Sequence, residues 1–186
     1  MIIVNLYANG VRILRPNEAT QLIATIPKED NKCKFEVLLY TGARYSEIKA
    51  LYDNPRWFNG VSIDMPNTKF LVKKKVKSRN IRLNPKGQRA VNQYLYRCKT
   101  GLPHYSNWRN DLKRWFKLAG LDSDGVGIRT TRKTYESWLV IKYESKVLHI
   151  LSSMGHSQST ALQHYLNLGF TPEDISQMNP YTEGWI

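Results

Sequence analysis

The sequence predicts a mainly helical domain with a small three-stranded antiparallel β-sheet, an α+β fold. Apolar residues recur with helical periodicity over most of the chain, and between Trp57 and Leu83 the pattern changes to strand-like alternation. A chain of 186 residues, of which 41% are hydrophobic, can fill one substantial core, and no internal repeat is visible. We therefore expect a single compact domain.

Helices are predicted where apolar residues recur every three or four positions between turn residues. Pro16 stands at a first helical position, Pro27 ends that helix, and Gly42 breaks the next one. The predicted helices cover residues 16–26, 32–40, 85–96, 107–118, 129–142, 146–154, 159–168 and 172–178, with an amphipathic turn at 47–51. The helix at 107–118 should face the core with Trp108, Leu112, Trp115 and Phe116.

The predicted sheet uses the alternating segments 61–64, 69–75 and 79–83, with turn residues near 66–67 and 76–78. A further short strand with a turn at Asn9-Gly10 is expected in residues 1–14. The second turn of the sheet carries five cations, namely Lys73, Lys74, Lys75, Lys77 and Arg79. So many like charges repel one another unless they meet phosphates or are well solvated, and either explanation fits the pattern.

The charge balance favours a polyanionic partner. The chain has 28 Lys and Arg against 15 Asp and Glu, a formal net charge of +13. An excess of this size attracts polyanions, of which nucleic acid is the commonest, although a solubility surface or a ribosome-like basic protein would have a similar composition. Nucleic-acid binding is the favoured interpretation.

Other features exclude several classes of protein. Cys33 and Cys98 stand far apart with no second Cys or His at metal-ligand spacing, so a disulfide framework or a zinc site is not expected. No apolar run approaches the roughly 18–20 residues of a membrane span, and the N-terminus lacks a signal-peptide pattern. We therefore expect a protein of the cytoplasm without a bound metal.

Three arginines are candidate phosphate ligands. Arg129 and Arg132 stand three positions apart at the start of a predicted helix, so their side chains share one face. Arg44 follows the glycine corner at Thr41-Gly42. A guanidinium presents a planar fork that matches phosphate oxygens. Taken singly, each arginine is equally consistent with an ordinary surface position.

Four segments in this order resemble the tyrosine recombinase (phage integrase) family, over roughly residues 17–168. They are TGARYSEIKAL at 41–51, LVKKKVKSRNIRL at 71–83, RTTRKTYESWL at 129–139 and GHSQSTALQHY at 155–165. The family signatures are a TGxRxxE box, a β-hairpin lysine, an HxxR or KxxR box before a helix, and an LGH box with a tyrosine nine residues after its histidine. The resemblance implies the catalytic-domain fold of that family.

The resemblance also implies a role for each matching residue. Tyr165 would attack the scissile phosphate and form a 3′-phosphotyrosyl intermediate, which requires no cofactor and no metal. Arg44 and Arg132 would clamp the phosphate. Lys74 would donate a proton to the leaving 5′-oxygen, with Lys73 as the second choice. His156 would contact the phosphate or orient the nucleophile. Glu47 would support the arginine corner.

Arg129 departs from the family pattern, which has His or Lys at this position. An arginine stays charged across the physiological pH range, so it still binds phosphate but is a poor proton shuttle. With arginine at this position, the chain resembles archaeal and viral integrases.

The resemblance implies double-stranded DNA as partner, with a homotetramer on paired sites and a monomer or weak oligomer when free. The charge of the predicted hairpin makes Lys73, Lys75, Lys77 and Arg79 the candidate DNA contacts. Residues 1–16 would be an arm or linker, 17–168 the catalytic domain and 169–186 a tail that docks on a neighbouring protomer or folds back on its own domain. Full recombinases of the family carry an additional N-terminal DNA-clamp domain, so we expect either a catalytic-domain fragment, which is the favoured interpretation, or a minimal enzyme. A recombinase-fold DNA-binding protein without activity and a type IB topoisomerase-like enzyme are the alternative functions.

Overall fold

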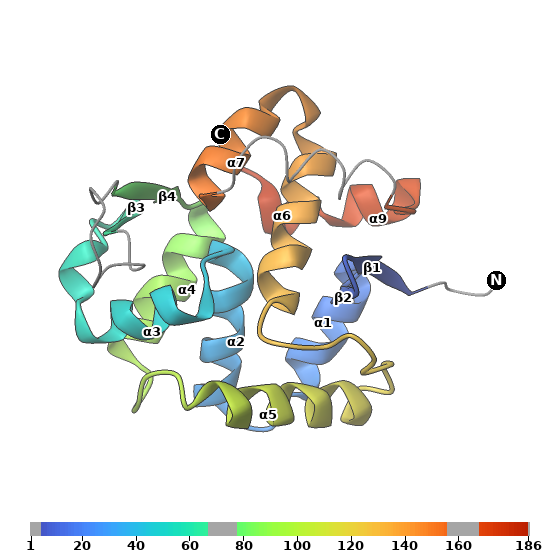
Figure 1. Ribbon diagram of the computed structural model, residues 1–186, viewed down its shortest axis with the longest axis horizontal. Coiled ribbons are helices and arrows are strands. Elements are labelled where there is room, and N and C mark those ends of the chain that lie inside the picture. The colour runs from blue at the N-terminus through green and yellow to red at the C-terminus, as the bar shows by residue number, and fades with distance from the viewer. Residues whose placement is uncertain (1–4, 67–77, 156–167, 186) are drawn as a thin grey trace.

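The computed structural model describes residues 5–66, 78–155 and 168–185 (Figure 1). The helices in these ranges are α1 (Pro16–Thr25), α2 (Glu29–Thr41), α3 (Tyr45–Asp53), α4 (Pro85–Tyr96), α5 (Tyr105–Leu118), α6 (Thr130–Lys142), α7 (Val147–Met154), α9 (Pro172–Gln177) and α10 (Asn179–Thr182). Short 3₁₀ helices lie at Pro55–Trp57 and Glu144–Lys146. The strands are β1 (Leu6–Ala8), β2 (Val11–Ile13), β3 (Ser62–Met65) and β4 (Arg79–Arg82).

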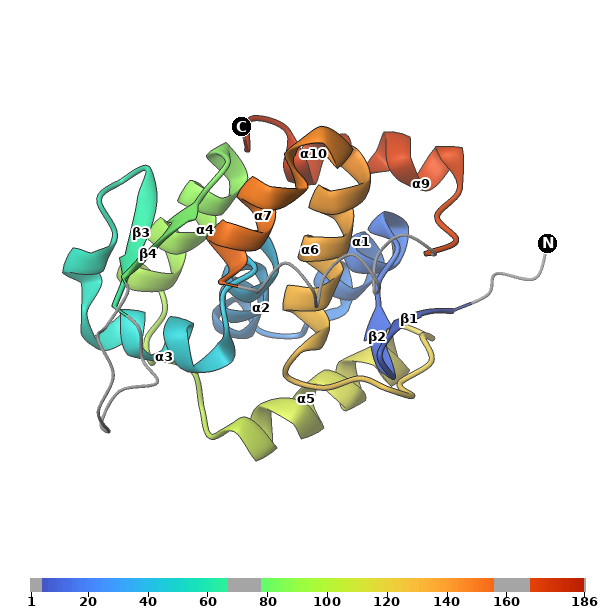
Figure 2. The ribbon, with the colours of Figure 1, turned by 45° about the horizontal axis from the view of Figure 1, so that its top comes forward.

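Helix α6 is the centre around which the other elements pack. Its side chains are buried from Thr130 to Arg132 and again from Thr134 to Val140, so most of the helix is enclosed. Helix α2, strand β2 and helix α7 lie against it, and α5 crosses beneath its first turn (Figures 1 and 2). The indole of Trp138 is fully buried and donates to Leu14 O at 3.0 Å. Polar side chains on a helix that is buried on nearly all sides usually have hydrogen-bond partners, and this applies to Arg132 in the first turn of α6.

Most of the helical predictions are confirmed. Helix α1 begins at Pro16 as expected, and α4 has the predicted bounds. The predicted inward face of α5 is buried, and its four cations are exposed: Arg109, Lys113, Arg114 and Lys117. Helix α10 was not predicted, because four residues that include Pro180 show no periodic pattern. The predicted helix at 159–168 falls almost entirely outside the described residues.

The prediction of one three-stranded sheet is wrong, since the described strands form two separate two-stranded sheets. Strands β3 and β4, the first and third segments of the predicted sheet, pair directly, with Ile63 opposite Ile81. Segment 69–75, the predicted middle strand, lies outside the described residues. The second sheet is the hairpin of β1 and β2. Alternation identifies strand segments but not their partners, because pairing depends on contacts between residues distant in sequence.

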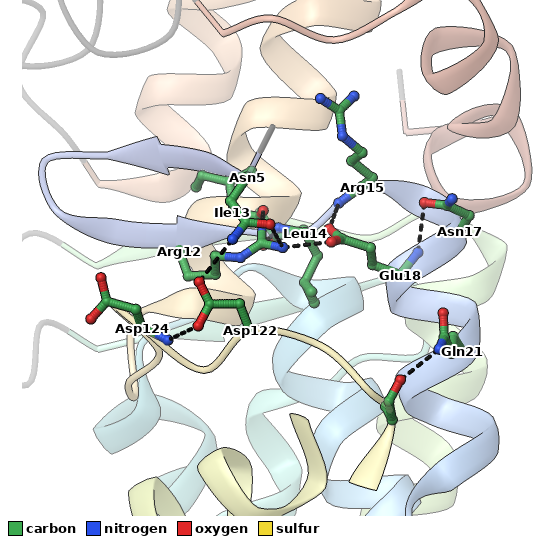
Figure 3. Close-up of polar contacts among 12 residues, drawn as sticks. Asn5, Arg12, Ile13, Leu14, Arg15, Asn17, Glu18, Gln21, Asp122 and Asp124 are labelled. Atoms are coloured by element: carbon green, nitrogen blue, oxygen red, sulfur yellow. Dashed lines mark hydrogen bonds and ion pairs between the residues drawn. The ribbon is translucent and has the colours of Figure 1, made fainter. Parts of the chain in front are cut away.

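The N-terminal hairpin closes at Asn9-Gly10, where both residues have positive φ (51° and 69°). This is the backbone that a tight two-residue hairpin turn requires. Arg12 of β2 is fully buried, pairs with Glu18 of α1, and donates at 3.0 Å to the side chain of Asn5 (Figure 3). The ion pair joins the hairpin to α1, and breaking it would leave an uncompensated buried charge.

The C-terminal tail packs on its own domain. The Tyr181 ring lies 5.0 Å from that of Trp138 and 5.9 Å from that of Tyr40, and Trp185 is buried. Arg15, which follows the hairpin, forms an ion pair with Asp174 of α9. Of the two arrangements left open by the sequence, the structure therefore shows the one in cis. No helix in the described ranges is long and apolar enough to cross a membrane.

Replacing Asp174 with alanine is expected to destabilise the protein by about 3 kcal/mol, because breaking a buried ion pair leaves the partner cation uncompensated. Asp174 also accepts hydrogen bonds from the backbone and hydroxyl of Thr171, at 2.8 and 3.0 Å, which the substitution removes. Urea unfolding followed by circular dichroism measures the change. Glu173→Ala removes an exposed carboxylate from the same turn and should shift stability by less than about 0.5 kcal/mol. Equal effects for the two variants would contradict a structural role for the Arg15 contact.

Candidate phosphate-binding site

Arg44 is held at a rigid corner between α2 and α3. Gly42 ends α2 in the left-handed conformation (φ 60°), and a Cβ at this position would lie 2.6 Å from Met154 Cε. The left-handed backbone favours glycine, and a larger residue would also require Met154 to move. The Arg44 backbone N–H and Nη1 donate to the two carboxylate oxygens of Glu47, at 2.7 and 2.8 Å. These two hydrogen bonds orient the Arg44 guanidinium, while 40% of the side chain stays exposed.

Arg132 comes from the first turn of α6 and reaches the same corner. It is buried, donates from Nη1 to Gly42 O at 2.9 Å, and donates from Nη2 to Met154 O. Burial lowers the pKa of Arg132 to about 10, against the opposing effect of the nearby Glu136 carboxylate. The guanidinium therefore remains protonated at neutral pH. Arg44 and Arg132, far apart in the chain, are both tied to the end of α7.

Both arginines line an open cavity of about 650 Å³. The exposed Arg129, at the N-terminal end of α6, lines it too. The full lining consists of Asn9, Val11, Arg44, Tyr45, Ser46, Lys49, His104, Tyr105, Ile128, Arg129, Arg132 and Lys133. Five of these are Lys or Arg, and no acidic residue is among the lining residues that the structure describes. Such a concentration of guanidinium and ammonium groups in a concave site favours an anion such as phosphate.

Arg79, predicted to contact DNA, is engaged within the protein. Its Nη2 forms an ion pair with Glu47 and its Nη1 donates to Ser153 O at 2.9 Å. Burial lowers the pKa of Arg79, against the opposing effect of the Glu47 carboxylate. Glu47 is buried and pairs with both Arg44 and Arg79.

The other predicted site residues lie outside the described residues: Lys73, Lys74, Lys75, Lys77, His156 and Tyr165. The described chain reaches Gly155, which ends α7 in the left-handed conformation with φ 67°. Its carbonyl accepts from Arg44 Nη2 at 3.1 Å. The predicted phosphate clamp is therefore in contact with the residue that directly precedes His156 in the sequence.

Several cavity residues were not identified from the sequence. Lys49 lies on α3, which Arg44 directly precedes, and Lys133 follows Arg132, so proximity in sequence was an available signal for both. Lys133 lies 3.8 Å from Glu136, and burial lowers its pKa. His104 and Tyr105 had no such signal, because they come from the loop and first turn that begin α5. In the described ranges no group of three or more His, Cys, Asp or Glu side chains could hold a metal.

Comparison with solved structures identifies the fold. The crystal structure of XerA recombinase superimposes with a TM-score of 0.64 over 92% of this chain and 65% of that chain, at 17% identity. The chain has the tyrosine recombinase catalytic-domain fold. XerH site-specific recombinase, in a pre-cleavage complex bound to its difH substrate, gives a TM-score of 0.57 over 83% of this chain and 50% of that chain, at 18% identity. No family model matches the sequence, and no curated protein sequence is significantly similar to it.

The tyrosine recombinase fold confirms the expectation derived from the four motifs. The chain spans between half and two thirds of the length of the two recombinases. At this level of identity the similarity establishes the fold alone, and the roles of individual residues rest on the motif positions and on the geometry of the cavity.

Proposed function

We propose that this chain is a site-specific DNA recombinase that cleaves and rejoins DNA strands through a 3′-phosphotyrosyl intermediate. The observation that carries the proposal is the convergence of Arg44 and Arg132 in one cationic cavity within a tyrosine recombinase fold. Two guanidinium groups fixed on separate elements suit a phosphate whose charge increases in the transition state. Residues 17–168 would carry the catalytic machinery.

Each step is assigned to a residue of this chain. The Tyr165 oxygen attacks the scissile phosphorus and its proton passes to solvent water. The bond from phosphorus to the 5′-oxygen breaks, and Lys74 protonates that oxygen. Arg44, Arg132 and His156 bind the non-bridging oxygens. Rejoining reverses these transfers with the 5′-hydroxyl of a second strand as nucleophile, so no external energy source is consumed.

Double-stranded DNA is the proposed partner. The net charge of +13 supplies a long-range attraction, and the cationic cavity supplies a local one. Lys73, Lys75 and Lys77, which the sequence predicts to lie in a hairpin, are proposed phosphate contacts. Strand exchange would require assembly on paired sites, for which we propose a homotetramer.

Covalent trapping on DNA tests the activity. The protein is incubated with a pool of nicked duplexes of randomised sequence, in which the short 3′ fragment diffuses away after cleavage and prevents rejoining. An adduct that survives denaturing electrophoresis is expected, and sequencing the attached DNA yields the target site. DNA binding without any adduct would contradict the proposed activity and would favour a DNA-binding protein without chemistry, a function compatible with Arg129 at the position of the family's His or Lys.

Adduct formation is expected to be unchanged by EDTA, because the proposed clamp uses arginines to neutralise the phosphate. The recovered target duplex is incubated with protein in excess EDTA, and the adduct yield is compared with that in Mg²⁺. A loss of more than about tenfold that added Mg²⁺ restores would show that metal chemistry participates. Binding measured in parallel by fluorescence anisotropy controls for effects of Mg²⁺ on DNA affinity.

A further inference from the structure

Three arginines from three different elements hold the end of α7. They donate to the carbonyls of consecutive residues: Arg79 to Ser153 O at 2.9 Å, Arg132 to Met154 O, and Arg44 to Gly155 O at 3.1 Å. The last carbonyls of a helix lack intrahelical partners and lie at the negative end of its dipole, so cations are favourable there. Two of these arginines line the cavity, whereas Arg79 is not among its lining residues.

The guanidinium of Arg79 is in contact with protein on two sides. One nitrogen pairs with Glu47 and the other reaches Ser153 O, and the side chain is only 15% exposed. A Cβ at Gly155 would lie 2.8 Å from Arg79 Nη1, so the head group packs directly on the end of α7. Little of this side chain is accessible to a DNA phosphate, in contrast to Arg44, which is 40% exposed.

Glu47 connects Arg79 to Arg44. Its side chain is 3% exposed, and its two carboxylate oxygens are divided between the two guanidinium groups. A buried carboxylate requires compensation by cations and hydrogen bonds. Without Arg79, the whole charge of Glu47 would act on Arg44 and shift its guanidinium slightly while the contact with a bound phosphate is kept, and Ser153 O would lose its partner.

We propose that Arg79 is a positioning residue, which fixes Arg44 through Glu47 and the end of α7 through Ser153, and does not contact a DNA phosphate. The inference rests on the proposed recombinase function, in which Arg44 binds the scissile phosphate. It replaces the expectation, based on hairpin charge, that Arg79 contributes to DNA affinity.

Two measurements separate positioning from DNA contact. The first is the salt dependence of DNA affinity. Log K, where K is the association constant, falls with log salt, and each lost phosphate contact reduces the magnitude of this slope by about 0.9. The second is the rate of single-turnover cleavage at saturating protein. For Arg79→Ala we expect an unchanged slope and a rate lower by about 10-fold to 100-fold, because small displacements of a clamp group are costly. The cleavage rate of Arg79→Lys should lie between those of Arg79→Ala and wild type, since one ammonium group cannot reach both acceptors as the guanidinium does.

Arg82→Ala is the matched control, because it removes an exposed cation from the same strand. Its cleavage rate at saturation should equal that of wild type. For Arg79→Ala, a slope reduced by about 0.9 with a wild-type rate would show a DNA contact and overturn the proposal. A wild-type slope with a wild-type rate would also overturn it.

Coupling to Glu47 gives a test that needs neither activity nor a well-folded alanine variant. Arg79→Lys, Glu47→Gln and the double variant are compared by urea unfolding. If Arg79 acts through Glu47, the shifts in midpoint are non-additive, whereas additive shifts would contradict the link. Absence of a covalent adduct in wild type would instead contradict the proposed function, and the two failures are thus distinguishable.

Discussion

Replacing Tyr165 with phenylalanine is expected to abolish the covalent protein–DNA adduct while DNA affinity stays within about threefold of wild type. The substitution removes only the hydroxyl oxygen that attacks the phosphate, and loss of a nucleophile in a covalent mechanism costs several orders of magnitude in rate. The target duplex carries a label at the 5′ end of the cleaved strand, because a 3′-phosphotyrosyl link retains that part of the strand on the protein. Denaturing electrophoresis measures the adduct, and fluorescence anisotropy measures affinity.

Tyr105→Phe is the control for this substitution, because Tyr105 is an exposed tyrosine on the cavity. Its adduct yield should match that of wild type. An adduct that persists in Tyr165→Phe and disappears in Tyr105→Phe would reassign the nucleophile. Peptide mapping of the trapped wild-type adduct identifies the modified tyrosine directly.

Replacing Arg132 with alanine is expected to lower both stability and cleavage. The substitution leaves Gly42 O and Met154 O without their guanidinium partner in the interior, which corresponds to about 2–4 kcal/mol. Loss of one group that stabilises transition-state charge costs about 100-fold to 1000-fold in rate. Urea unfolding measures the first effect, and single-turnover cleavage of the recovered target duplex measures the second.

Two further substitutions separate the contributions of Arg132. Arg132→Lys retains a positive charge without the planar fork, so cleavage should recover in part and stability should remain below wild type. Arg129→Ala removes an exposed arginine of the same cavity, and its effect on stability should stay within about 0.5 kcal/mol. Wild-type cleavage by a folded Arg132→Ala protein would remove this residue from the proposed clamp.

The helices could be predicted because the signals that define them are local. The proline at α1 and the glycine that ends α2 act on their own backbone, and the apolar stripe of α5 lies within one short segment. The fold class and the motif resemblance followed from the same local patterns and their order. Comparison with solved structures confirmed both at the level of the fold.

The strand pairing could not be predicted, because a period of two shows that a segment is extended but not which segment it meets. The contacts of Arg79 within the protein could not be predicted for a related reason. A cation in a basic hairpin has the same sequence signature whether it contacts solvent, phosphate or a buried carboxylate, and only its approach to Glu47 and Ser153 distinguishes these cases.

Residue types and their spacing were thus sufficient to propose the chemistry of the site, since the planar guanidinium group matches the oxygens of a phosphate. The tertiary structure decided that Arg44, Arg129 and Arg132 share the cavity, whereas Arg79 pairs with Glu47. It also showed the tail folded on its own domain, with Arg15 against Asp174. These arrangements depend on burial and on contacts between segments distant in sequence, and neither quantity can be read from a local pattern.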